Sequence, residues 1–197
     1  MKEFHINTEI FFGEKALDRL SMLPFKNVLI ITDPFVVSSG MITLLTTRLD
    51  KAHIEYTLFT DVVPDPPVEK VISGVATVMQ IKPPCIICVG GGSAIDTAKA
   101  IAVGVPYEGD FWDFYCGKAS VEKALPVGTV LTIAAAGSEG SGDTVVTQES
   151  TGLKRGAGGN ALRPRFSIMN PELTCTLPPF QTACGACDIM AHVFERY

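Results

Sequence analysis

Residues 90–99 constrain the fold of this chain more than any other segment. They read Gly-Gly-Gly-Ser-Ala-Ile-Asp-Thr-Ala-Lys, follow the apolar run 85–89 and lead into the apolar stretch 98–103. The first run predicts a buried strand and the second a helix, with Ser93 as its N-cap residue. Glycines at such a turn let the backbone approach a phosphate, toward which the free N–H groups of the first helical turn point. A tight turn without a ligand is the alternative.

Strand and helix patterns alternate along the rest of the chain. Residues 4–12 are predicted as extended and 180–197 as helical, and two further strands, 144–147 and 165–169, flank a loop at 152–160. The apolar runs that predict strands are 28–33, 54–59, 85–89 and 127–134, and the helical patterns lie at 14–22, 41–52 and 68–81. Such alternation predicts an α/β fold, a Rossmann-like parallel sheet with helices on both faces. Ligands of such sheets bind beyond the carboxyl ends of the strands, where one crevice can hold both Asp33 and the glycine turn.

Length and charge limit the classes of partner. The 197 residues are enough for one substantial domain core, and the formal net charge is −5. Without a basic stripe, neither nucleic acid nor an anionic membrane is an expected partner. No apolar run approaches the roughly 18 residues that span a bilayer, and the first residues lack the apolar region of a secretory signal. We therefore expect a cytoplasmic protein.

The six cysteines include two pairs with the spacing C-x-x-C, Cys85 with Cys88 and Cys184 with Cys187. Residues three apart in a strand point to opposite faces, so the first pair cannot chelate one ion. A structural zinc site needs four ligands, and the second pair supplies only two of them. We therefore expect the first pair to be small buried apolar residues.

Two runs of residues resemble one protein family. The pattern of Ser93, Asp96 and Lys99 after the glycines resembles the signature GGGS-x-x-D-x-x-K of the iron-containing (group III) alcohol dehydrogenases, within the dehydroquinate-synthase-like superfamily. The run N-P-E-L-T at 170–174, L-P-P at 177–179 and D-x-x-x-H at 188–192 is similar to a second motif of that family. The resemblance covers nearly the whole chain. It implies reversible hydride transfer between a primary alcohol or its aldehyde and a nicotinamide cofactor, NAD or NADP.

The resemblance also implies which positions hold the dinucleotide. Gly91, Gly92 and Ser93 would contact the pyrophosphate, and Asp33 would bind the adenosine ribose and repel a 2′-phosphate, which favours NAD. The full expected set is Asp33, Gly91, Gly92, Ser93, Asp96, Thr132, Ser138 and Lys154. Thr132 and Ser138 match a family loop near the nicotinamide, although Ile133, Ala135 and Ala136 replace its usual Thr, Gly and Thr, and Lys154 matches a lysine that reaches the nicotinamide ribose.

Three members of this set have a plainer interpretation. Asp33 precedes a proline and could simply start a loop. Asp96 could be an acidic residue favoured near a helix start by the helix dipole. Lys154 could be a solvated lysine beside Arg155.

Asp188 and His192 are four residues apart, so on a helix they share one face and could bind a divalent cation. Taken alone, such a pair is more often a surface pair. The resemblance implies that they are the first two ligands of a catalytic Fe²⁺, and Zn²⁺ would also suit them. The family's two further histidines belong to a following all-helical domain, and the only other histidines here are His5 and His53. The chain therefore carries half of a metal site.

We accordingly expect a dinucleotide-binding domain at 1–179, with 180–197 as the start of a truncated helical metal-binding domain. Without the rest of that domain, the last helix would leave an apolar face uncovered. Its members are Phe180, Ile189, Val193 and Phe194. An exposed apolar face seeks a partner, so we expect self-association into a homo-oligomer.

The two halves of the chain resemble different branches of the family. Residues 1–103 are similar to propanol and ethanol dehydrogenases, and the chain from Tyr107 onward is similar to butanol dehydrogenases, many of which prefer NADPH. This predicts a recombinant or engineered chimera joined at 103–107. Two other functions stay open at this point: a non-catalytic dinucleotide-binding module, and another enzyme of the superfamily, such as a zinc-dependent glycerol dehydrogenase or a dehydroquinate synthase.

Overall fold

The computed structural model describes residues 6–195, which contain a six-stranded parallel sheet. The strand order is β1-β8-β5-β4-β2-β3, and every neighbouring pair in it is parallel. The strands are β1 (Glu9–Phe12), β2 (Asn27–Thr32), β3 (Glu55–Phe59), β4 (Ile86–Gly90), β5 (Val127–Leu131) and β8 (Phe166–Met169). The predicted Rossmann-like α/β class is confirmed.

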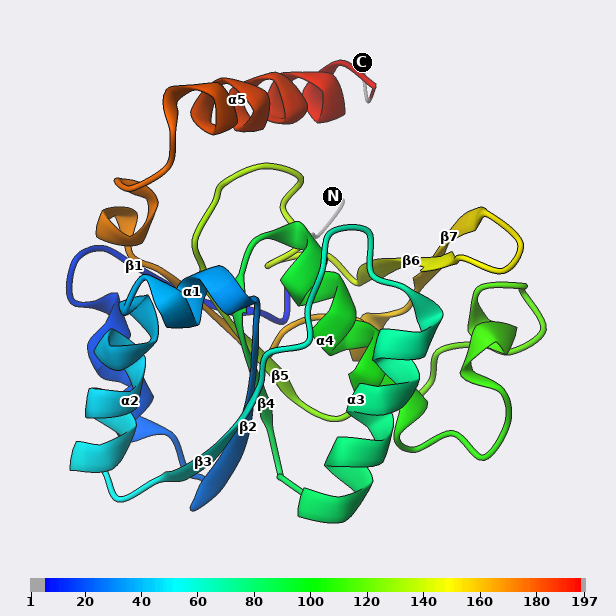
Figure 1. The fold of residues 1–197 in the computed structure, drawn as a ribbon, viewed down its shortest axis with the longest axis horizontal. Coiled ribbons are helices and arrows are strands. Elements are labelled where there is room, and N and C mark those ends of the chain that lie inside the picture. The colour runs from blue at the N-terminus through cyan, green and yellow to red at the C-terminus, as the bar shows by residue number, and fades with distance from the viewer. Residues whose placement is uncertain (1–5, 196–197) are drawn as a thin grey trace, which may run out of the picture.

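Helices cover both faces of the sheet (Figure 1). Helices α1 (Pro34–Ser38) and α2 (Met41–Lys51) lie on one side, and α3 (Val68–Ile81) and α4 (Gly92–Gly104) lie on the other. Within residues 6–195, four 3-10 helices lie in the connections: η1 (Ala16–Met22), η2 (Phe111–Phe114), η3 (Asn160–Leu162) and η4 (Pro171–Thr174). Because helices cover both faces, β2 and β4 carry continuous buried apolar runs, at 28–31 and 86–89.

Alternate residues of the central strands enter two separate apolar cores. Cys88 packs with α3 and α4, whereas Cys85 packs with α1 and α2. The two thiols therefore point to opposite faces, as predicted from their spacing, and both are buried.

The expected loop at 152–160 is wrong. Residues Leu153–Gly158 form β7, which pairs antiparallel with β6 (Asp143–Gln148) in a separate two-stranded sheet. The turn between them includes Gly152, whose φ of +68° suits a glycine. The β7 sequence Leu-Lys-Arg-Gly-Ala-Gly has no apolar alternation, so main-chain pairing rather than a buried face defines this strand.

Other boundaries also differ from the expectations. The predicted strand at 165–169 does not flank a hairpin but enters the main sheet as β8, between β1 and β5. The predicted helix at 14–22 is the 3-10 helix η1, the strand at 127–134 ends at Leu131, and the helix expected at 98–103 begins at Gly92. Of the extended segment predicted at 4–12, residues 4 and 5 lie outside the described part of the chain.

Helix α5 (Pro179–Phe194) stands beyond the carboxyl edge of the sheet, apart from the other layers (Figure 1). Gly185 is its one buried residue within the described chain. Phe180 and Phe194 are 74% and 68% exposed, and Ile189 and Val193 are exposed as well. All four residues of the expected apolar face are therefore exposed, but they do not share one face: at 3.6 residues per turn, Phe180 and Phe194 lie on the opposite side of the helix from Ile189 and Val193. Residues 196 and 197 of the predicted helix lie outside the described residues. None of the helices described within 6–195 combines the length and apolarity needed to cross a membrane.

Candidate dinucleotide site

The glycine turn joins β4 to α4 in a backbone shape that depends on its glycines. Gly90 has a φ of +156°, and a Cβ there would lie 2.6 Å from the Ala94 Cβ. A Cβ on Gly91 would lie 2.4 Å from Cγ2 of Ile133. Only glycine lets the chain pass so close to these neighbours.

Ser93 is not the N-cap residue of α4, contrary to the expectation. Gly91 has the extended backbone of the N-cap position, and no side chain caps the helix. Ser93 lies within the first turn, where its carbonyl accepts a hydrogen bond from the Thr97 hydroxyl at 2.8 Å. The first N–H groups of α4 thus have no side-chain partner, which leaves them for an anion.

A cavity of about 540 Å³ opens beside this turn, beyond the carboxyl ends of β2 and β4. Its volume lies within the range of small-molecule pockets. It is lined by Asp33, Pro34, Phe35, Val62, Val63, Pro64, Gly91, Gly92, Ser93, Ala94 and Ile133. Four residues of the expected set, Asp33, Gly91, Gly92 and Ser93, therefore meet at one cavity with apolar walls.

Asp33 has two roles in this arrangement. It is the N-cap residue of α1, where Oδ1 accepts a hydrogen bond from the Val36 N–H at 3.0 Å. It also lines the cavity next to the glycine turn, where Oδ2 lies 3.7 Å from the position of a Cβ on Gly90. Asp33 can thus start the segment before Pro34 and also present a carboxylate to the cavity.

Asp96 and Ser138 lie outside the cavity and contact each other. The Ser138 hydroxyl donates to Asp96 Oδ1 at 2.9 Å, and the Val145 N–H donates to Oδ2 at 3.3 Å. Burial raises the pKa of the Asp96 carboxyl, and its Ser138 hydrogen bond and the nearby Lys99 charge oppose that shift. Asp96 therefore belongs to a polar network between α4 and the segment after β5, and is more than an acid near a helix start.

Lys99 belongs to the same network, and the sequence interpretation assigned it no role. Its side chain is fully buried, and Nζ lies 2.6 Å from the Ser138 carbonyl oxygen and 2.9 Å from that of Asp143. Burial lowers its pKa to about 8, although the Asp96 charge favours the protonated form. The signal was present in the sequence: Lys99 is the one charged residue in 97–105, and a lysine is rarely buried without partners.

Thr132 lies beside the glycine turn, whereas Lys154 lies at the surface. The Thr132 N–H donates to the Gly90 carbonyl at 3.1 Å, which ties the end of β5 to the glycine turn. Lys154, on β7, is more than half exposed and forms an ion pair with Asp65. Its amino group is thus paired at the surface and does not line the cavity.

Asp188 and His192 share one face of α5, as their spacing predicts. Asp188 Oδ1 lies 3.8 Å from His192 Nε2, and both side chains are about half exposed. Among residues 6–195, no group of three or more histidine, cysteine, aspartate or glutamate side chains is placed to hold a metal ion. A catalytic metal normally has at least three protein ligands, so this pair has suitable chemistry but is not a full donor set.

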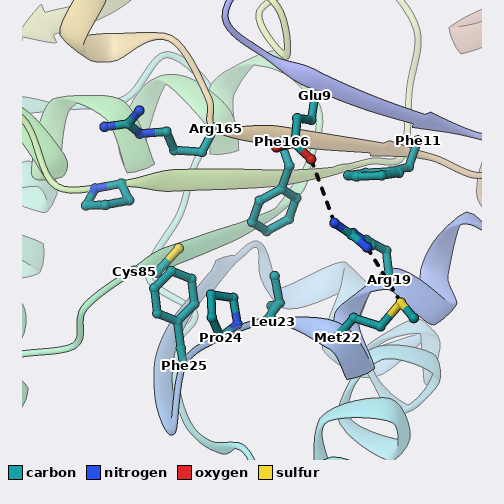
Figure 2. A pocket seen from close by; sticks show the side chains of 11 residues that line it. Glu9, Phe11, Arg19, Met22, Leu23, Pro24, Phe25, Cys85, Arg165 and Phe166 are labelled. Atoms are coloured by element: carbon teal, nitrogen blue, oxygen red, sulfur yellow. Dashed lines mark hydrogen bonds and ion pairs between the residues drawn. The ribbon is translucent and has the colours of Figure 1, made fainter.

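A second cavity, of about 250 Å³, lies near the opposite ends of the strands (Figure 2). Cys85, Pro126 and Arg165, which directly precede β4, β5 and β8, help to line it. Its wall includes Arg19, which pairs with Glu9 at 3.8 Å and lies over the Phe11 ring, 4.7 Å from the centroid. No residue of the glycine turn reaches this cavity, so it is separate from the candidate site.

Fold and site together place the chain among α/β proteins that have a cavity at the carboxyl edge of a parallel sheet. The sequence model of the family described as iron-containing alcohol dehydrogenase matches residues 7–171. The chain therefore belongs to the iron-containing alcohol dehydrogenase family.

Individual relatives agree with this assignment. The chain is 40% identical over 195 residues to a probable NADH-dependent butanol dehydrogenase 2 of Bacillus subtilis, covering 96% of this chain and 50% of that protein. It is 32% identical to a 1-propanol dehydrogenase of Citrobacter freundii, covering 100% and 50%. Its fold matches the crystal structure of NADH-dependent butanol dehydrogenase A of Thermotoga maritima with a TM-score of 0.94 and 37% identity, covering 99% and 50%.

The chain spans about half the length of the curated relatives that it matches. The butanol dehydrogenase relative and the propanol dehydrogenase relative each align with nearly the whole of this chain. The predicted junction between two family branches at 103–107 is tested by neither alignment and stays a prediction.

Proposed function

We propose that this chain is the dinucleotide-binding part of an alcohol dehydrogenase that interconverts primary alcohols and aldehydes with NAD as cofactor. The observation that carries the proposal is the open N-terminus of α4 beside the cavity that Asp33 faces. Relatives named as NADH-dependent butanol dehydrogenases support the substrate class and the cofactor.

The residues of the cavity fit a dinucleotide. Gly91, Gly92 and Ser93 would hold the pyrophosphate on their backbone N–H groups, and Asp33 would accept hydrogen bonds from the adenosine ribose. The apolar walls formed by Val62, Pro64 and their neighbours would exclude water from the adenine. Bound NAD would supply the hydride acceptor for oxidation of the alcohol to the aldehyde, with one proton released.

The described residues supply only Asp188 and His192 toward a metal site. We propose these two side chains as ligands for Fe²⁺, or for Zn²⁺. The proposed division into a dinucleotide domain at 1–179 and a helical segment at 180–197 agrees with the separate position of α5. Self-association through α5 and a cytoplasmic location remain predictions.

A non-catalytic dinucleotide-binding module is the second candidate, and the two-ligand metal pair favours it. The candidates differ in one measurement. In a chain extended to the full length of the butanol dehydrogenase relatives, with Fe²⁺, NAD and 1-butanol present, the dehydrogenase produces NADH, whereas the module binds cofactor without turnover.

The first test is a titration with NADH and NADPH, followed by energy transfer from Trp112, the one tryptophan of the chain. We expect NADH to saturate with a dissociation constant between about 1 μM and 1 mM, the usual range for cofactors and substrates. NADPH should bind more weakly because the Asp33 carboxylate repels its 2′-phosphate. Absence of saturation with both cofactors would contradict the proposed function.

Asp33 should decide the choice between the cofactors. In Asp33→Ser, the hydroxyl can still accept from the Val36 N–H, so the α1 cap and stability should change by only a few tenths of a kcal/mol. The negative charge is gone, and we expect the ratio of NADPH to NADH affinity to rise about tenfold or more, because like charges in contact cost several kcal/mol. The same titration measures it.

Asp33→Ala is the matched control, since it removes both the charge and the cap and should also lose about 1 kcal/mol of unfolding free energy. An unchanged affinity ratio in the serine variant would show that Asp33 does not face the ribose.

A further inference from the structure

Lys99 is a buried ammonium group that the proposed cofactor contacts do not use. Nζ lies within 2.6–3.0 Å of three backbone carbonyl oxygens, those of Ser138, Ser141 and Asp143. An ammonium group has three N–H donors, so each carbonyl can receive one of them. Both serine hydroxyls lie 3.2 Å from the same nitrogen. The Lys99 side chain on α4 thus forms hydrogen bonds along the whole segment 138–143.

Four groups that face Lys99 favour the protonated amine. Asp96 lies on α4, Cys88 on β4, Glu139 on the segment after β5, and Asp143 at the start of β6. Burial has the larger effect and lowers the pKa of Lys99 to about 8. The amine is therefore charged at neutral pH but loses its proton at moderately alkaline pH, where it keeps only two donors for three carbonyls.

The segment 138–143 lies on the side of the glycine turn away from Asp33. Strand β4 has β2 on one side and β5 on the other. Asp33 directly follows β2, whereas 138–143 belongs to the connection that leaves β5. A dinucleotide with its phosphates at Gly91–Ser93 and its adenosine at Asp33 therefore extends its second half toward the β5 side, where Asp96 and Ser138 meet.

We propose that Lys99 is a positioning residue for that second half of the dinucleotide. Its ammonium group holds 138–143 against α4, and Ser138 then holds the Asp96 carboxylate at the β5 side of the glycine turn. This inference rests on the proposed function, because it requires that the cleft binds a nicotinamide dinucleotide. Lys99 itself touches no part of the cofactor.

The test compares NADH with ADP, which lacks the nicotinamide riboside half. In Lys99→Met, a side chain of similar length loses all three donors. We expect the dissociation constant for NADH to rise about tenfold, while that for ADP changes by less than about twofold. Lys51→Met, at an exposed position at the end of α2, is the matched control and should match the unaltered chain with both ligands.

A pH titration of the unaltered chain needs no variant. The charged amine makes all three contacts, so NADH affinity should be full below the Lys99 pKa of about 8 and fall as the pH rises through it. Lys99→Met should lose this pH dependence. If that variant does not fold, Ser138→Ala replaces it, because it removes the hydroxyl that joins Lys99 to Asp96 and should weaken NADH but not ADP.

The outcomes separate this inference from the proposed function. If the unaltered chain binds neither NADH nor ADP, the proposed function fails. If it binds NADH but Lys99→Met binds NADH equally well, or loses ADP and NADH by the same factor, the positioning role of Lys99 is wrong. A flat NADH affinity across the alkaline range would overturn it as well.

Discussion

Gly90→Ala is expected to destabilise the chain by about 3 kcal/mol and to abolish NADH binding. The φ of +156° at Gly90 is a conformation that L side chains rarely adopt, and holding one there costs about 1–3 kcal/mol. The new Cβ would also lie 2.6 Å from the Ala94 Cβ, on a helix that has no room to withdraw. Such overpacking costs a further 1–3 kcal/mol or so. Urea unfolding followed by circular dichroism measures the loss.

Gly92→Ala is the matched control within the same turn. A Cβ on Gly92 would meet no atom of the chain within 4 Å, and the residue is already helical. Stability should therefore stay equal or rise by up to about 1 kcal/mol, because alanine restricts the unfolded chain. NADH binding should still weaken, by about tenfold, if the phosphates approach this backbone closely. A Gly90→Ala variant as stable as the unaltered chain would contradict this account of the turn.

Gly74→Ala is expected to cost about 2 kcal/mol of unfolding free energy, although alanine is the better helix former by about 1 kcal/mol. Gly74 lies in the middle of α3 and faces α4, where a Cβ would come within 2.1 Å of Ile101 Cδ1 and 2.7 Å of Cγ1. Ile101 is fully buried, so its side chain cannot swing into solvent. Either the buried Ile101 side chain adopts a less favourable rotamer or α3 and α4 move apart, and a shift of α4 would also move the glycine turn.

A double-mutant cycle isolates this contact. Ile101→Ala alone should lose about 2–5 kcal/mol because it leaves a cavity in the core. In the double variant, the methyl group at position 74 no longer meets Cδ1 or Cγ1 and fills part of that cavity. We expect the two losses to be less than additive by about 1 kcal/mol or more, measured by urea unfolding of all four chains. Additive losses would mean that α3 and α4 do not meet at these residues.

The fold class could be predicted because its signals are local. The continuous apolar runs in β2 and β4 indicate strands that are buried on both faces of the sheet. The glycine turn indicates a junction between a strand and a helix. Asp188 and His192 share a face because helical geometry alone places residues four apart together. Cys85 and Cys88 point apart because strand geometry alone separates them.

The sequence by itself thus determined the parallel α/β architecture, the position of the glycine turn, and the family signature that predicts the cofactor. Tertiary structure alone decided that β7 pairs with β6, that Asp65 pairs with Lys154, and that Lys99 forms hydrogen bonds to the backbone of 138–143. For β7 the physical reason is that its sequence has no apolar alternation, although it follows β6 directly in the chain. For the two lysines the reason is separation along the chain. Lys99 meets carbonyls 39 to 44 residues away and Lys154 meets a carboxylate 89 residues away, and no local pattern of apolar and polar residues encodes such partners.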